Sequence, residues 1–79
     1  MKLNGKEIVG WAAVRRSCNE SGAGVMCLDP ITNNAEFEVE RGEILYFTFD
    51  TLNVAAEYVA HYNGEPMAPL VDWATKMYR

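Results

Sequence analysis

Glutamates occupy every second position of the stretch AEFEVERGE: Glu36, Glu38 and Glu40, with Glu43 following a glycine. On a β-strand, residues two apart point the same way and lie about 7 Å apart, a spacing comparable to that of successive phosphates along a nucleic-acid strand. The first three glutamates, which we call the acidic row, therefore suit contact with a surface that normally binds phosphate. We interpret the row, together with Glu43 and Tyr46, as a candidate binding site for a protein partner.

The residues expected opposite the acidic row support this interpretation. Across a hairpin the row would face Thr48, Tyr46 and Ile44, with no lysine or arginine to neutralise it. A purely structural sheet tends to place an opposite charge across the strand from an acid. Tyr46 and Ile44 would add the apolar centre that protein interfaces need. The alternative is a solvated strand face, which is the usual meaning of alternating charge.

Thiol chemistry is the second possibility that the residue types allow. Cys18 or Cys27 could act as a nucleophile activated by His61, which Glu57 would orient from one helical turn earlier. No recognisable motif surrounds either cysteine, and in a reducing compartment both are expected to be free thiols. Because these residues and Asp29 are scattered without metal-ligand spacing, the sequence predicts no metal site and no cofactor.

The distribution of charge argues against direct binding to nucleic acid. The net charge is −4, but residues 17–75 contain ten acids and a single base, Arg41. A nucleic-acid-binding domain needs the opposite bias, because phosphate contacts dominate its affinity. Trp11, although it is followed by Arg15 and Arg16, is therefore expected to be a core aromatic rather than a base-stacking residue.

Two helices are expected in the second half of the chain. Residues 51–62 repeat apolar side chains at helical spacing, with Asp50 as the expected N-cap and Asn63-Gly64 as a left-handed stop. A shorter amphipathic helix follows, with Pro69 in its first turn and Lys76 near its end, where the charge complements the helix dipole.

Residues 35–49 show the period of two that predicts strands. A three-residue loop at 41–43 would place apolar residues opposite one another on one face, whereas a two-residue loop would mix the faces. A single strand bent at Gly42 would keep the same alternation. The hairpin register gives the pairs Val39 with Leu45, Phe37 with Phe47, and Ala35 with Phe49.

The first third of the chain is expected to add two further strands. Residues 25–28 form a short apolar run between turn clusters. Residues 7–16 fit either a strand or a helix, and we favour the strand because apolar residues alternate around Gly10. The expected fold is a single α+β domain, 1–79, with the order β-β-β-β-α-α. Its small antiparallel sheet of about four strands has both helices packed on one face.

The chain is expected to be a cytoplasmic protein, since it has neither a run of 18 apolar residues nor a signal-peptide pattern. At 79 residues, one core leaves a net stability of only about 3 to 5 kcal/mol. Association with a partner or with a second copy is therefore a plausible source of additional stability.

Three functional hypotheses follow. The first is a small acidic, non-enzymatic interaction protein that binds and inhibits a larger partner, by covering a basic surface used for nucleic acid. Its size, fold class and charge are similar to those of small inhibitors encoded by phages and other mobile elements, including anti-CRISPR proteins, which act in the host cytoplasm. The second is a thiol-dependent enzyme or redox protein that uses Cys18 or Cys27 with His61. The third is an accessory domain that self-associates through Trp73, Met77 and Tyr78.

Overall fold

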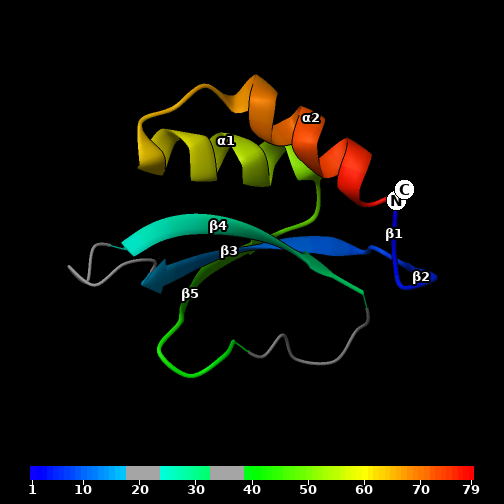
Figure 1. Cartoon of the computed structure of the whole chain (residues 1–79), viewed down its shortest axis with the longest axis horizontal. Helices are drawn as coiled ribbons and strands as arrows, with labels where there is room; N and C mark the ends of the chain where they lie inside the picture. The colour runs from blue at the N-terminus through cyan, green and yellow to red at the C-terminus, as the bar shows by residue number, and fades with distance from the viewer. Residues whose placement is uncertain (18–23, 33–38) are drawn as a thin grey trace.

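The computed structural model describes residues 1–17, 24–32 and 39–79. The fold is α+β, as the sequence predicts, and these described residues form five strands in two antiparallel sheets and two helices (Figure 1). Its elements are β1 (Lys2–Leu3), β2 (Lys6–Glu7), β3 (Gly10–Ser17), β4 (Gly24–Ile31), β5 (Ile44–Phe49), α1 (Leu52–Asn63) and α2 (Met67–Met77). The strand count is slightly higher than the predicted four.

The larger sheet is built around β3, which pairs antiparallel with β4 on one side and with β5 on the other. The strands predicted at 7–16 and 25–28 correspond to β3 and β4, although β3 begins only at Gly10 and β4 is longer, with 8 residues. The four consecutive apolar residues of β3, positions 11–14, are all buried. A central strand covered on both faces has this continuous apolar pattern, which explains why residues 7–16 were ambiguous in the sequence.

The smaller sheet is the short hairpin β1–β2, which the sequence analysis did not predict. Asn4 and Gly5 form its turn with φ angles of 52° and 81°. Two successive residues with positive φ match the twist of a two-residue hairpin, and Asn-Gly is the sequence that favours it. The hairpin brings Lys2 opposite Glu7.

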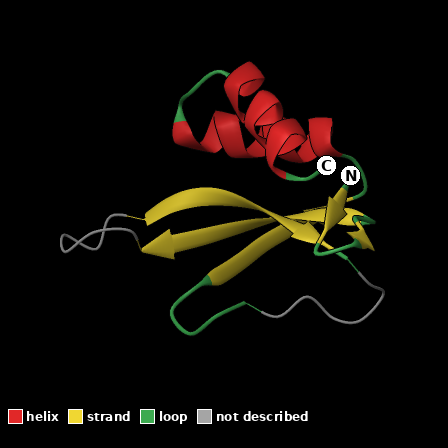
Figure 2. Ribbon diagram, turned by 45° about the vertical axis from the view of Figure 1, so that its right-hand side comes forward, coloured by secondary structure: helices red, strands yellow, loops and turns green. Residues whose placement is uncertain are grey.

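Both helices lie on one face of the larger sheet (Figure 2), again as predicted. Thr51, rather than the predicted Asp50, is the N-cap of α1, and its side-chain oxygen accepts a hydrogen bond from the Val54 N–H. At the other end Gly64 adopts φ 68°, and its N–H closes the helix on the Ala60 and His61 carbonyls. The predicted left-handed stop is therefore confirmed, whereas the predicted start is wrong by one residue.

The core lies between the helices and the sheet. Small side chains dominate the helix surface that faces the strands, so the helices approach the sheet closely. Trp11 is only 3% exposed and belongs to this core, as expected from the acidic composition. The buried cluster consists of Trp11, Ala13, Met26 and Leu28 from the sheet, Ala55, Ala56 and Val59 from α1, and Ala74 from α2.

The hairpin predicted between 35–40 and 44–49 requires a correction. β5 pairs with β3, in the register Phe47 with Ala13 and Phe49 with Trp11. Val39 is described and lies outside any strand, so its predicted pairing with Leu45 is not formed. Residues 35–38 lie outside the described residues. Alternating polarity identified β5 as a strand, but it carried no information about which strand is the neighbour.

The turn before β5 also differs from the predicted three-residue loop. The Glu43 N–H donates to the Glu40 carbonyl at 3.0 Å, and Gly42 has φ 88°. Arg41 and Gly42 are therefore the two central residues of a tight turn, and the positive φ at the second of them is the reason for a glycine there.

The position of the α1 cap can be tested by two neighbouring substitutions. We expect Thr51→Ala to lower the free energy of unfolding by about 1 kcal/mol, because the Val54 N–H loses its acceptor. Asp50→Ala should change it by less than about 0.5 kcal/mol, as for an ordinary exposed position. Urea unfolding of both variants measures the difference, and a larger loss in the Asp50 variant would contradict the assignment.

Candidate functional site

The structure places only part of the predicted binding site. Glu36 and Glu38 lie outside the described residues. Glu40 is exposed at the start of the tight turn, in no strand. Glu43 folds back, and its carboxylate accepts a hydrogen bond of 2.8 Å from the Glu40 N–H. Glu40 thus remains a candidate contact residue, while Glu43 has a structural partner.

Glu43 has a second partner in Arg16, which also binds Asp29. Nε of Arg16 donates to a Glu43 carboxylate oxygen, Nη2 donates to Oδ2 of Asp29, and Nη1 donates to Oδ1 of Asp29 at 3.1 Å. Only 11% of the Glu43 side chain is exposed. The guanidinium therefore joins β3 to β4 and to the residue that precedes β5, and it neutralises two of the ten central acids.

This ion-pair cluster changes the proton affinities of its members. Hydrogen bonding to Asp29, and secondarily to Glu43, raises the pKa of Arg16 above its ordinary value in spite of partial burial. The backbone N–H of Glu40 and then the Arg16 side chain lower the pKa of Glu43 below its usual 4.5. Both shifts favour the charged forms, so Arg16 and Glu43 remain ionised at neutral pH.

The cluster lies on the sheet face away from the helices. Trp11 and Ala13 belong to the helix-facing core, and side chains alternate along a strand, so Val14 and Arg16 share one face with Ala12. Ala12 and Val14 are nevertheless completely buried.

Tyr46 lies on the sheet face that packs against the helices, and not on the face predicted to carry the acidic row. It packs against the core cluster, and its ring contacts Tyr62 of α1 edge to face, with centroids 5.7 Å apart. A hydrogen bond with Tyr46, together with burial, raises the pKa of Tyr62. The register shift between Ala13 and Val14 falls at this point of the β3–β5 ladder. A bulge re-aims side chains, which period-two counting cannot anticipate.

An apolar hollow of about 450 Å³ lies where β5 meets α1. Phe49 and Tyr58 provide aromatic walls, with ring centroids 5.4 Å apart, and Val54 is 52% exposed beside them. Glu57 and His61, one helical turn apart, complete the lining. We call this site the corner hollow, and it combines apolar surface with one carboxylate.

Sequence reasoning identified Glu57 and His61 only as a possible orienting pair for a thiol. It missed the aromatic residues around them, because Phe49 comes from a strand and Tyr58 from the helix that follows. The sequence signal that could have indicated this site is Val54, an apolar residue that does not belong to the buried stripe of α1.

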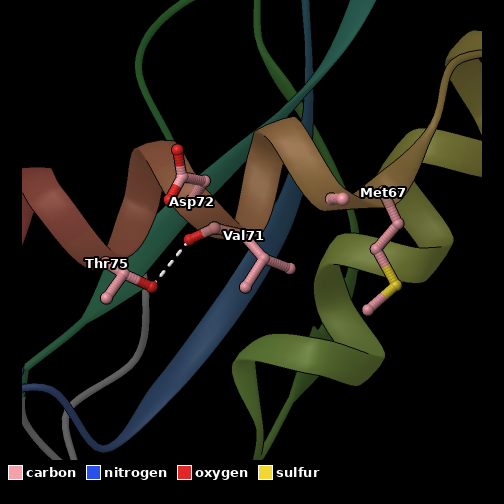
Figure 3. Close-up of a pocket in the computed structure, with 5 residues that line it drawn as sticks. Met67, Val71, Asp72 and Thr75 are labelled. Atoms are coloured by element: carbon pink, nitrogen blue, oxygen red, sulfur yellow. Dashed lines mark hydrogen bonds between the residues drawn. The ribbon is translucent and has the colours of Figure 1, made fainter.

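A second hollow lies along α2 and is shown in Figure 3. Met67, Val71, Asp72 and Thr75 line it, and the Thr75 hydroxyl donates to the Val71 carbonyl at 2.7 Å. The carboxylate of Asp72 accepts a hydrogen bond from Lys76, one turn later. Its polar groups are thus engaged within the helix, and this hollow offers less to a charged ligand than the corner hollow does.

The described residues do not bring a thiol to the histidine. Cys18 lies outside them. Cys27 alternates with Met26 and Leu28, which face the helices, so it lies on the far side of the sheet from His61 on α1. Within residues 1–17, 24–32 and 39–79, no group of three potential metal ligands is found.

Of the three residues considered for self-association, two are exposed on α2 and one packs against the core. Trp73 and Met77 are 42% and 58% exposed on α2. Tyr78 packs edge to face on both Trp11 and Trp73, and burial raises its pKa. Tyr78 therefore contributes mainly to the core, and Trp73 and Met77 form the exposed part of that surface.

Comparison with known proteins adds no assignment. The chain matches no protein-family model, no curated protein and no solved structure. In the part of the chain that the structure describes, no helix is long and apolar enough to cross a membrane.

The role of Glu43 can be tested through the pH dependence of stability. Its pKa is lowered in the folded state, so its ionised form stabilises the fold above pH 4.5, and this contribution disappears as the pH falls through the lowered pKa. We expect Glu43→Gln to be less stable than the wild type at neutral pH and equally stable in strong acid. Urea unfolding across this pH range measures the difference.

Glu57→Gln is the matched control, because Glu57 is exposed and no ion pair involves it within the described residues. It should unfold like the wild type at every pH. A stability difference between Glu43→Gln and the wild type that does not change with pH would show that Glu43 acts through something other than its charge.

Proposed function

We propose that this protein is a non-enzymatic interaction protein that binds a larger protein partner with a basic surface. The observation that carries the proposal is the set of acids that remain without a counter-charge. Within the described residues, the ion pairs involve Glu7, Asp29, Glu43 and Asp72. The acids that remain are Glu40, Asp50, Glu57 and Glu65.

The corner hollow is the site that best fits a basic side chain of the partner. A lysine or arginine entering it would place its aliphatic stem against Val54 and its charge near Glu57. The faces of Phe49 and Tyr58 would attract the same cation through their ring quadrupoles. Aromatic anchors beside a carboxylate are typical of the centre of a binding surface, where truncation of one residue costs most affinity.

The acidic row would be a second contact region, at the other end of β5 from the corner hollow. Glu40 is exposed, and Glu36 and Glu38 add charge of the same sign in the sequence just before it. A partner that binds nucleic acid would present a complementary basic groove. Binding there would block that groove, and we propose inhibition of this kind, as in phage-encoded antagonists, as the biological role.

The thiol hypothesis has less support. Cys27 lies on β4 of the sheet and His61 on α1, in different layers of the fold. The partner-binding proposal therefore rests on the charge and shape of the surface, and the thiol hypothesis lacks a described catalytic pair.

The test is affinity capture from the native cell, followed by binding measurements on the purified captured partner. Glu57→Lys should weaken binding about tenfold or more, because it places a like charge where the partner's cation docks. The wild-type affinity should fall as the salt concentration rises.

Glu65→Lys is the comparison variant, since it makes the same charge change at an unpaired acid between α1 and α2 that does not line the corner hollow. It should weaken binding less than Glu57→Lys does, because only the general attraction between acidic and basic surfaces is reduced. A partner whose affinity is insensitive both to salt and to Glu57→Lys would contradict the proposal.

A further inference from the structure

The two edges of the larger sheet are not equally protected. Along the β4 edge, the Asn63 side chain accepts a hydrogen bond of 3.0 Å from the Met26 N–H and donates one of 2.8 Å to the Met26 carbonyl. The amide group thus takes the place of a neighbouring strand at this residue. Four residues further along the same edge, Pro30 has no N–H to offer. Both devices discourage another chain from pairing there.

The outer edge of β5 shows no such protection in the described part of the chain. The backbone N–H and carbonyl of Met26 point away from β3, so the β3 residue opposite Met26 directs its own backbone groups toward β5. Because this direction alternates along a strand, the other odd-numbered residues of β3, including Trp11 and Ala13, also direct their N–H and carbonyl groups toward β5. Their partners Phe49 and Phe47 bond inward, which leaves the N–H and carbonyl of Thr48, between them, pointing outward.

The composition of β5 is unusual for an edge strand. Its six residues, ILYFTF, include no charge and no proline, the two features that commonly prevent edge-to-edge pairing. Ile44, Leu45 and Phe47 are 52%, 37% and 56% exposed. An uncharged, apolar edge of this kind is a template for another strand.

Charged residues at the two ends of β5 determine which kind of strand can pair with its outer edge. Arg41 and Asp50 are exposed on either side of β5, and neither forms an ion pair within the described residues. Glu43, also at the first end, is neutralised by Arg16. Antiparallel pairing of two copies of β5 would bring Arg41 of one chain near Asp50 of the other, twice by symmetry.

We propose that β5 pairs antiparallel with β5 of a second copy of this chain, and that a two-fold axis between them joins the two three-stranded sheets. The pairing satisfies the outward groups of Thr48 in both chains and covers part of the exposed apolar edge. It also offers a small domain the additional stability that its single core lacks. The inference goes beyond the proposed function, since Glu57 lies on α1 and not on the strand edge.

The experiment is sedimentation of the wild type and four edge variants from about 1 μM to about 1 mM, the range in which a weak dimer would form. The wild type should approach twice the 8.9 kDa mass of the chain. Thr48→Pro removes the outward N–H and should abolish the dimer. Thr48→Val keeps that N–H and should leave the dimer intact.

Charge reversal gives a second readout that does not depend on a backbone change. Arg41→Asp should weaken dimerisation about tenfold, because it faces Asp50 of the partner copy. Asp50→Arg is combined with it in a double variant, which should restore the wild-type dimer. All variants are first checked by circular dichroism, and these exposed positions keep the test valid if Thr48→Pro fails to fold.

Three outcomes would overturn the inference. One is a mass of 8.9 kDa at every concentration. Another is a dimer that is unaffected by both the Thr48→Pro change and the charge reversals, which would place the interface elsewhere, for example at Trp73 and Met77. The third is a monomer whose Thr48 amide is protected from hydrogen exchange, which would mean that the edge is already covered within one chain.

Discussion

The contact of Arg16 with Asp29 and Glu43 joins the three strands of the larger sheet on the face away from the helices. One guanidinium reaches from the central strand to a carboxylate on β4 and to another just before β5. Charge-assisted, forked hydrogen bonds of this kind fix direction as well as distance. The Glu43 contact also sets the tight turn at residues 40–43, because the same carboxylate accepts the Glu40 N–H. The start of β5 and the exposure of Glu40 therefore both depend on Arg16.

A small core imposes the next constraint. Half of the buried cluster between the helices and the sheet consists of alanines, and the largest fully buried side chains are Val14 and Val59. Several larger aromatic and aliphatic residues remain only partly covered, such as Phe47 and Trp73. A chain of this length has too much surface for its volume to bury them all. Exposed apolar groups at the β5 edge and the corner hollow are thus a direct consequence of size, and they are where contacts with other chains gain most.

Local features were predictable from the sequence, whereas features that depend on distant residues were not. The α1 stripe and Gly64 are local signals, and both were identified. The N-cap was missed by one residue because Asp50 and Thr51 are both competent caps, and only the geometry selects between them. The neighbour of β5 depends on strands far apart in sequence, which period-two alternation does not encode. The role of Arg16 was hidden for the same reason, since a charge count assigned it to the basic end of the chain.

Ion pairs within the fold also determine how the charge of the corner hollow differs from that of the β5 edge. Arg16 neutralises Asp29 and Glu43, and Lys76 neutralises Asp72, so the acids that remain include Glu57 and Glu65 around α1. Two copies that approached each other through α1 would bring like charges together, which disfavours a dimer there. β5 has no charge along its length and opposite charges at its ends, so a second copy meets no repulsion at that edge. The unpaired acid Glu57 at the corner hollow favours a basic partner instead, so charge distinguishes the two proposed interactions.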